Sequence, residues 1–257
     1  MQPGHNPSFT ALGILDSTTI ADYLVMRNNP PTTLLGSLTP GPFDDLSGIW
    51  GFPGSTTVIE GPHLPVVDLA LRVILDATRA GIATLIIARS MDVCQRLLTV
   101  DLAIPELGEV RPQLSPQATE EVTAKAAGYQ DLPLSVITTE GMNVTTAVER
   151  AVAWCRDPAY NSERLIVVTD AHDLIVSAED WMEIVRLALG TKSSLLVCVG
   201  PGEVEAVPRL VNTVVTITSV DESYDVAVKR SWLLSAARLG AFDHDKRSGR
   251  WLARDES

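Results

Sequence analysis

The fold is decided by the stretch Thr56-Thr57-Val58-Ile59-Glu60-Gly61-Pro62-His63-Leu64-Pro65-Val66-Val67-Asp68. Its first four residues are all β-branched, which predicts a short buried strand. Apolar side chains then recur at helical spacing and predict a crossover helix that ends near Gly81. The polar residues Asp68, Arg72, Asp76 and Arg79 are expected off the apolar face, which consists of Val66, Leu69, Ala70, Val73, Ile74 and Ala77.

A strand, a glycine turn and a helix in this order are the layout of a phosphate-binding loop, whose pattern is G-x-x-x-x-G-K-[ST]. In that pattern the backbone wraps the phosphates, the lysine supplies charge and the hydroxyl holds magnesium. When the pattern is counted from Gly61, the second glycine is Val66, the lysine is Val67 and the hydroxyl residue is Asp68. Two valines and a carboxylate oppose a triphosphate, so we interpret the segment as a degenerate nucleotide site.

Short β-branched runs alternate with helical periodicity after Gly51, which is typical of a parallel sheet with crossover helices. Strands are predicted at 56–60, 84–88, 134–137, 165–169, 195–199 and 214–218, and helices at 91–100, 116–127, 145–155 and 178–189. Ser177 and Asp180 resemble a capping box before the last helix. The chain closes with predicted strands at 225–229, 234–243 and 250–253. The fold class is therefore α/β, a mostly parallel twisted sheet with crossover helices and a C-terminal antiparallel hairpin.

Residues 1–45 are rich in proline and have one short helix predicted around 17–27, so they are expected to form an arm. Residues 46–257 are expected to form one domain. The chain of 257 residues is 46% apolar, which is enough for a sizeable core, and its net charge is -12. That charge argues against a surface that grips nucleic acid through its phosphates. Contact with nucleic acid through a local basic patch stays open, since basic residues gather at 229–254.

The three cysteines are far apart and are expected to be reduced core residues. The four histidines share no metal-ligand spacing, so no metal site is predicted. The start of the chain lacks the pattern of a signal peptide, and no apolar run approaches a membrane span. We therefore expect a cytoplasmic protein with no membrane contact.

Over roughly residues 37–254 the sequence resembles the ATPase domain of DnaB-type replicative helicases, within the RecA and KaiC superfamily. The resemblance rests on the order of the elements and on the opening segment from Leu38 to Gly61. In that family the next strand ends in a glutamate that activates the attacking water. Ser90 follows Arg89 at this place, and serine cannot accept a proton at neutral pH without a base of its own. The resemblance therefore implies that hydrolysis is lost as well.

Two further landmarks of the family fall later in the chain. The magnesium-side carboxylate at a strand end is retained as Asp170, although an aspartate there also commonly caps a turn. The phosphate-sensing glutamine is absent from Val199-Gly200-Pro201-Gly202. The family's Lys-x-Arg segment, which reaches a neighbouring subunit, is similar to Lys229-Arg230, and neighbours on a strand point to opposite faces. The resemblance marks these two residues as a candidate subunit contact.

Three functions are compatible with these observations. The first is a catalytically inactive RecA/DnaB-like protein that needs no cofactor and acts in replication or recombination by contact with a helicase, with RecA-like subunits or with itself. The second is a binder of nucleotide or another anion through Gly61, the helix start and Asp170. The third is an unrelated enzyme on a doubly wound sheet, with chemistry at strand ends such as Arg89, Asp170 or Asp173. Rebuilding the loop with glycine, lysine and threonine at 66–68 is expected to recover some nucleotide binding but little turnover.

Overall fold

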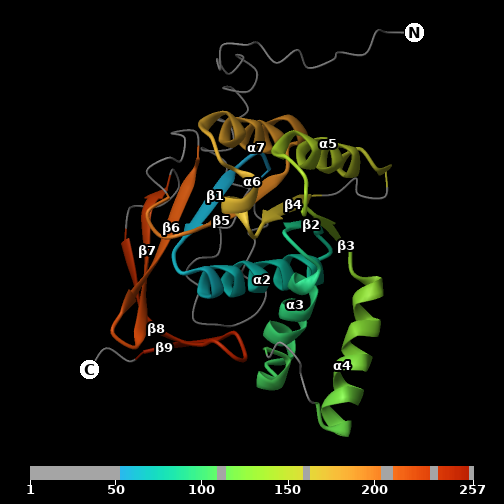
Figure 1. Cartoon of the computed structure of the whole chain (residues 1–257), viewed down its shortest axis with the longest axis vertical. Coiled ribbons are helices and arrows are strands. Elements are labelled where there is room, and N and C mark those ends of the chain that lie inside the picture. Colours follow the sequence, from blue (N-terminus) through green and yellow to red (C-terminus); the bar gives the residue numbers. More distant parts are fainter. Residues whose placement is uncertain (1–52, 109–113, 159–162, 204–210, 232–236, 255–257) are drawn as a thin grey trace. The chain divides into compact units, whose positions relative to one another are not determined.

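The computed structural model describes residues 53–108, 114–158, 163–203, 211–231 and 237–254 (Figure 1). The predicted arm with its helix around 17–27 lies outside these residues. Within the described part, one sheet of nine strands has the order β3-β2-β4-β5-β1-β6-β7-β8-β9. The strand β1, Thr56–Glu60, lies near the middle of this sheet and has the bounds that the sequence predicts.

The first six strands of this order run parallel, and all but the edge strand β3 are buried over most of their length. Both faces of such strands are covered, so they appear in the sequence as continuous apolar runs. They are β3, β2, β4, β5, β1 and β6, and apart from β1 they span Leu134–Thr138, Ala83–Ala88, Arg164–Val168, Ser194–Val199 and Thr213–Val220.

The last three strands turn the sheet antiparallel. They are β7 (Ser223–Ser231), β8 (Ala237–Asp245) and β9 (Arg250–Ala253). The sequence predicted a terminal hairpin, and β8–β9 confirms it. The antiparallel part is larger than that hairpin, because β6 and β7 also pair in this way over eight residue pairs.

Helices cover both faces of the parallel part (Figure 1). On one face α2 (His63–Arg79) and α3 (Asp92–Leu102) pack over Ile59, Ile86 and Leu196. On the other face α5 (Val144–Cys155) and α7 (Ala178–Thr191) pack over Val58, Leu85 and Val197. Short helical turns are formed by η2 (Pro105–Gly108), η3 (Tyr129–Asp131) and α6 (Ala171–Leu174).

The ends of the helices follow the local chemistry of their sequences. Ser177 and Asp180 form the predicted capping box, since each side chain bonds to the other residue's backbone N–H at 2.9–3.1 Å. Asn143 caps α5 in the same manner by accepting from the N–H of Thr146 at 2.9 Å. Most predicted element ends agree with the structure to within one or two residues.

The helix α4 (Pro116–Gly128) contributes no side chain to the hydrophobic core, and it contains no buried residue. It is attached through Asp101 at the end of α3, whose nearly buried carboxylate is bonded by Arg79, by Lys125 at 3.1 Å and by the hydroxyl of Tyr129 at 2.8 Å. Burial opposes ionisation of Asp101, but these hydrogen bonds outweigh it and hold the pKa of the carboxyl below its usual value.

Candidate functional site

The connection between β1 and α2 is only two residues long. β1 ends at Glu60 and α2 begins at His63, so Gly61 and Pro62 alone join them. The sequence predicted that the helix begins after the loop pattern, and this start is wrong by several residues. The four positions 63–66, where the pattern has loop residues, form the first turn of the helix instead. The chain therefore has no extended loop at this point.

Gly61 is required by close packing. A Cβ atom at this position would lie 2.5 Å from the carbonyl oxygen of Ile217 and 2.8 Å from its Cβ. Contacts that short do not occur, so any other residue would push β6 away from the start of α2. The one glycine of the phosphate-loop pattern that the sequence keeps thus has a structural reason of its own.

The first turn of α2 offers few hydrogen-bond donors. Pro65 has no N–H, and the N–H of Val66 bonds to the carbonyl of Pro62 at 3.1 Å. Only the N–H groups of His63 and Leu64 can point out of this end of the helix. A phosphate cradle relies on several successive backbone N–H groups, and this segment cannot supply them.

Asp68 is the largest departure from the sequence-based expectation. It was placed off the apolar face, where its charge would repel phosphate, but its side chain is fully buried. Its carboxylate bonds to Arg96 of α3, with the Nε–Oδ1 distance at 2.6 Å, and to Nε2 of His244 of β8 at 2.7 Å. The carboxylate is thus neutralised inside the molecule. Val67 is buried as well, and Val66 is 1% exposed at the edge of the pocket described next.

A pocket of about 420 Å³ lies at the carboxyl ends of β1, β4 and β5. In open α/β sheets, ligands bind at this edge. Of the six predicted residues of the degenerate site, the structure brings only Val66 and Asp170 into the pocket. Gly61, Val67, Asp68 and Ser90 do not line it; the lining is His63, Val66, Arg89, Thr169, Asp170, His172, Asp173, Cys198, Val199, Gly200, Pro201 and Glu203.

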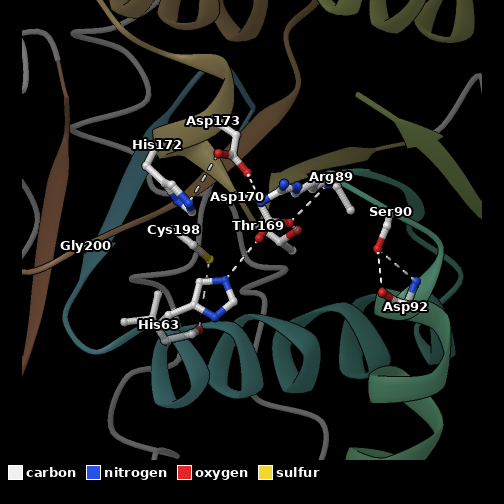
Figure 2. A network of polar contacts seen from close by, with 12 residues as sticks. His63, Arg89, Ser90, Asp92, Thr169, Asp170, His172, Asp173, Cys198 and Gly200 are labelled. Atoms are coloured by element: carbon white, nitrogen blue, oxygen red, sulfur yellow. Dashed lines mark hydrogen bonds and ion pairs between the residues drawn. The ribbon is translucent and has the colours of Figure 1, made fainter. Parts of the chain in front are cut away.

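His63 and Asp170 form the central contact of the pocket (Figure 2). The Nε2 atom of His63 lies 3.0 Å from Oδ1 of Asp170, and Oδ2 accepts from the backbone N–H of Arg89 at 3.1 Å and from the Thr169 hydroxyl at 2.8 Å. The hydrogen bond from His63 and these further donors lower the pKa of Asp170 to about 2. The same contact raises the pKa of His63 above 6.5. The pair is therefore an ion pair in weakly acidic solution.

A second charged group lies beside this pair. Nη1 of Arg89 is 3.2 Å from Asp173, and Nε2 of His172 is 3.5 Å from the same carboxylate. The rings of His63 and His172 meet edge to face at a centroid distance of 6.1 Å. His63, Arg89 and His172 of the pocket rim are thus each already in contact with a carboxylate of the same chain. The sequence marked Arg89, Asp170 and Asp173 as strand-end residues, but it gave no sign of the contact with His63.

Ser90 lies to one side of the pocket (Figure 2). Its hydroxyl donates to Asp92 at 2.9 Å and accepts from the backbone N–H of that residue at 3.3 Å, so it braces the start of α3. The thiol of Cys198 lines the pocket wall, but burial raises its pKa and keeps it protonated. Among the described residues, no group of three or more His, Cys, Asp or Glu side chains is arranged to hold a metal ion.

The turn after β5 is held by two glutamates. Glu203 accepts from the N–H of Gly200 at 2.9 Å, and Glu60 accepts from the N–H of Gly202 at 2.8 Å. Lys229 also reaches Glu60, at 3.4 Å, although its side chain is 60% exposed. The β6–β7 register passes from Arg230 to Val228, so Lys229 is the extra residue of a bulge. Arg230 is half-buried.

A parallel sheet with helices on both faces, an antiparallel extension and a pocket at its carboxyl edge define the RecA-like α/β class. Two solved structures share this fold. A DnaB-like replicative helicase, described with its interactions with primase, superposes with a TM-score of 0.66 at 10% sequence identity over 93% of this chain and 67% of that chain. The ATPase domain of G40P superposes with a TM-score of 0.64 at 9% identity over 95% of this chain and 99% of that one. At these identities the likeness shows the fold alone.

No family model matches the sequence, and no curated protein matches it. In the described part of the chain, no helix combines the length and the apolar character that a membrane span requires.

Proposed function

We propose that this protein is a RecA/DnaB-like domain that does not hydrolyse nucleotide and acts through protein contacts. The observation that carries the proposal is the two-residue connection between β1 and α2. A triphosphate needs a loop of backbone N–H groups and a lysine at this place. Here the same positions are a helical turn that contains Pro65, and the residue at the lysine position is the buried Val67.

The electrostatics of the pocket support the same conclusion. His63 and Arg89 are held by Asp170 and Asp173. A polyphosphate would have to break these contacts and would then face both carboxylates. Ser90, at the position that the resemblance assigns to the general base, has a neighbouring carboxylate in Asp92 but lies outside the pocket. Neither tight binding nor activation of water is favoured by this arrangement.

The fold suggests the field in which such contacts are made. The first structural neighbour is a DnaB-like replicative helicase that is described with its interactions with primase, and the second is an ATPase domain. We propose that this chain works in DNA replication or recombination, as a subunit-like partner of a helicase or in an assembly of its own. The domain limits 46–257, with residues 1–45 as an arm, and a cytoplasmic location belong to this proposal.

A second candidate is supported by the pocket itself. His63, His172 and Arg89 gather around a hollow large enough for a small anion, next to the N–H groups of His63 and Leu64. Protonation of His63, whose pKa is raised by Asp170, would add positive charge beside the carboxylates, so binding of a small anion would strengthen as the pH falls and this ring gains its proton. A nucleotide is not required for this role.

Calorimetric titration with ATP and magnesium, joined to a phosphate-release assay, tests the proposal. We expect no binding heat and no phosphate release. Phosphate release that follows the protein through purification and is lost in Asp170→Ala, but not in the matched variant Asp92→Ala outside the pocket, would disprove it. Binding heat with inorganic phosphate that is lost in His63→Gln would instead establish the anion-binding role.

A further inference from the structure

The outer face of the β8–β9 hairpin carries a row of exposed basic side chains with one exposed leucine. Arg250, Leu252 and Arg254 alternate along β9 and its end, so they share one face, while Trp251 between them is buried. The β8 residues paired with Arg250 and Leu252 are Asp245 and Asp243, and Asp243 also forms an ion pair with Arg254 at 3.2 Å. Leu252 is 62% exposed, one of four large hydrophobic residues of the described chain with such exposure. Together with the turn residues Lys246 and Arg247, these three side chains are called the basic strip below.

The turn that carries the basic strip is held rigidly. Arg96 donates to the carbonyls of Lys246 and Arg247, at 2.9 and 3.2 Å, while it bonds to the buried Asp68. Gly249 approaches α3 so closely that a Cβ atom there would lie 2.7 Å from Cγ2 of Val100. A buried ion pair is a costly way to hold a turn compared with apolar packing. Its effect here is to fix the direction in which exposed cations point.

α4 is the opposite case, an exposed helix with an acidic and small-apolar outer face. Glu120, Ala124 and Ala127 lie one turn apart on that face, Glu121 lies beside them, and all four are exposed. A helix of 13 residues without a buried side chain gains little from packing and is marginal in water. The buried Asp101 holds it in place through Lys125 and Tyr129.

The same helix, α3, therefore supports both surfaces. Arg96 in its middle bonds to the hairpin turn, and Asp101 near its end bonds to α4. In the sheet, the hairpin forms one edge and α4 leads to β3 at the other edge. The basic strip has four basic side chains against the carboxylates of Asp243 and Asp245, so it keeps an excess of positive charge beside its exposed leucine. The outer face of α4 is acidic with exposed alanines, so the charges and apolar parts of the two surfaces are complementary. Their places in the fold let them meet between two molecules.

We infer that the basic strip of one molecule docks on α4 of a second copy of this chain. Residues 1–45 are a poorer occupant of α4, because they contain four aspartates and one arginine and are themselves acidic. The contact is heterologous, since different surfaces of the two copies meet, and it produces a ring or an open chain. This inference rests on the proposed function, namely that the protein acts through protein contacts. The surface involved is separate from Lys229 and Arg230, the subunit contact that the sequence suggested.

The test is light scattering with mass determination on the full chain without nucleotide, as a function of protein and salt concentration. We expect self-association that weakens as salt rises. Arg247→Glu combined with Arg250→Glu should weaken it about tenfold or more, and Glu120→Lys combined with Glu121→Lys should do the same. An equimolar mixture of the two variants should associate again, because the reversed charges complement one another. Arg150→Glu with Arg156→Glu, which changes exposed cations of α5 and its end, should have little effect.

A protein that stays monomeric at every concentration would overturn the inference. Self-association that is unchanged in both charge-reversal variants would overturn it as well, and so would a mixture of the two variants that stays dissociated. The partner of α4 would then be residues 1–45 or another protein. Urea unfolding of each variant establishes that the substitutions act on contact and not on folding. Since no nucleotide is present, the result is independent of the hydrolysis test.

Discussion

Asp68 and His63 show how strongly the role of a residue depends on contacts that are distant in sequence. Both lie within the first two turns of α2. Asp68 turns into the protein and meets Arg96 and His244, whereas His63 stands at the pocket and meets Asp170, which is 107 positions away. The α2 sequence contains none of these three partners. At this scale, the residue type identifies a charge, and the fold decides what neutralises it.

The His63–Asp170 pair predicts a pH dependence of stability. The pKa of His63 is raised in the folded protein, so its contribution is fully present below the unfolded value of about 6.5 and is lost as the pH rises through the folded pKa. The pKa of Asp170 is lowered to about 2, so its contribution is lost only as the pH falls from about 3.8 toward 2. The stability difference between wild type and His63→Gln should therefore shrink as the pH rises above about 6.5.

NMR titration of the histidine rings checks the cause directly. His63 should titrate above 6.5 in the wild type and move back toward that value in Asp170→Asn. The pair is partly open to solvent, since the His63 side chain is 58% exposed, so the change in stability will be small. A His63 ring that titrates at or below 6.5 in the wild type would show that the contact with Asp170 does not persist in solution.

At the scale of elements, α2 and α3 together hold two peripheral elements, the β8–β9 hairpin and α4, in place. Each is fixed by one buried carboxylate: Asp68 for the hairpin and Asp101 for α4. The amphipathic pattern of α2 assigned Asp68 to a solvent face, because the pattern records only one apolar side. Here α3 and the β8–β9 turn cover the second side, so a polar residue became buried and required charged partners.

Asp101→Asn should loosen α4 more than it affects the rest of the protein. The amide cannot neutralise Arg79 and Lys125, and it weakens the bond from the Tyr129 hydroxyl. We expect amide hydrogen exchange across 116–128 to become faster while exchange in α7 changes little, with a global loss of about 1–3 kcal/mol. Asp131→Asn, which removes an exposed carboxylate next to the same region, is the control. Unchanged exchange in α4 would mean that Asp101 does not hold it.

The regular elements were predictable because their signals are local. The β-branched run at 56–60 and the apolar run at 195–199 are strands wherever both faces are covered, and Ser177 with Asp180 forms a cap without tertiary help. The start of α2 was not predictable from an alignment to a loop pattern, because Pro62 and Pro65 also suit a helix start. The pattern implied a loop where the local sequence favours a turn of helix.

At the scale of the whole molecule, the fold is that of the RecA-like class, but at the carboxyl edge of the sheet the charged side chains of this chain are paired with one another. The order of strands and crossovers places a pocket at the carboxyl ends of β1, β4 and β5, as the predicted parallel sheet required. The pairs inside that pocket could not be predicted, because Arg89 and Asp170 are 81 positions apart and meet only through the strand order. The sequence therefore predicted the sheet and its pocket edge, but it did not predict which side chains pair with one another inside the pocket.

Rebuilding the phosphate loop tests this view of the molecule as one coupled structure. The combined change Val66→Gly, Val67→Lys and Asp68→Thr restores the pattern in sequence, and from sequence alone some nucleotide binding was expected. In the structure it places a lysine at a position that is 6% exposed and leaves Arg96 without its buried partner. Breaking a buried pair alone costs about 3–5 kcal/mol, a large part of the stability of a typical domain. We now expect urea unfolding to show severe destabilisation and calorimetry to show no ATP binding.

A matched pair of variants isolates the cause of this instability. Asp68→Ala should lose about 3–5 kcal/mol, whereas Asp68→Ala combined with Arg96→Leu should recover part of that loss, because the guanidinium of Arg96 is then no longer left buried without its carboxylate. The recovery will be incomplete, since Arg96 also donates to the hairpin turn. A rebuilt variant that unfolds like the wild type and binds ATP would show that the helix start at His63 can reopen into a loop, and that three side chains alone decide whether this segment binds nucleotide.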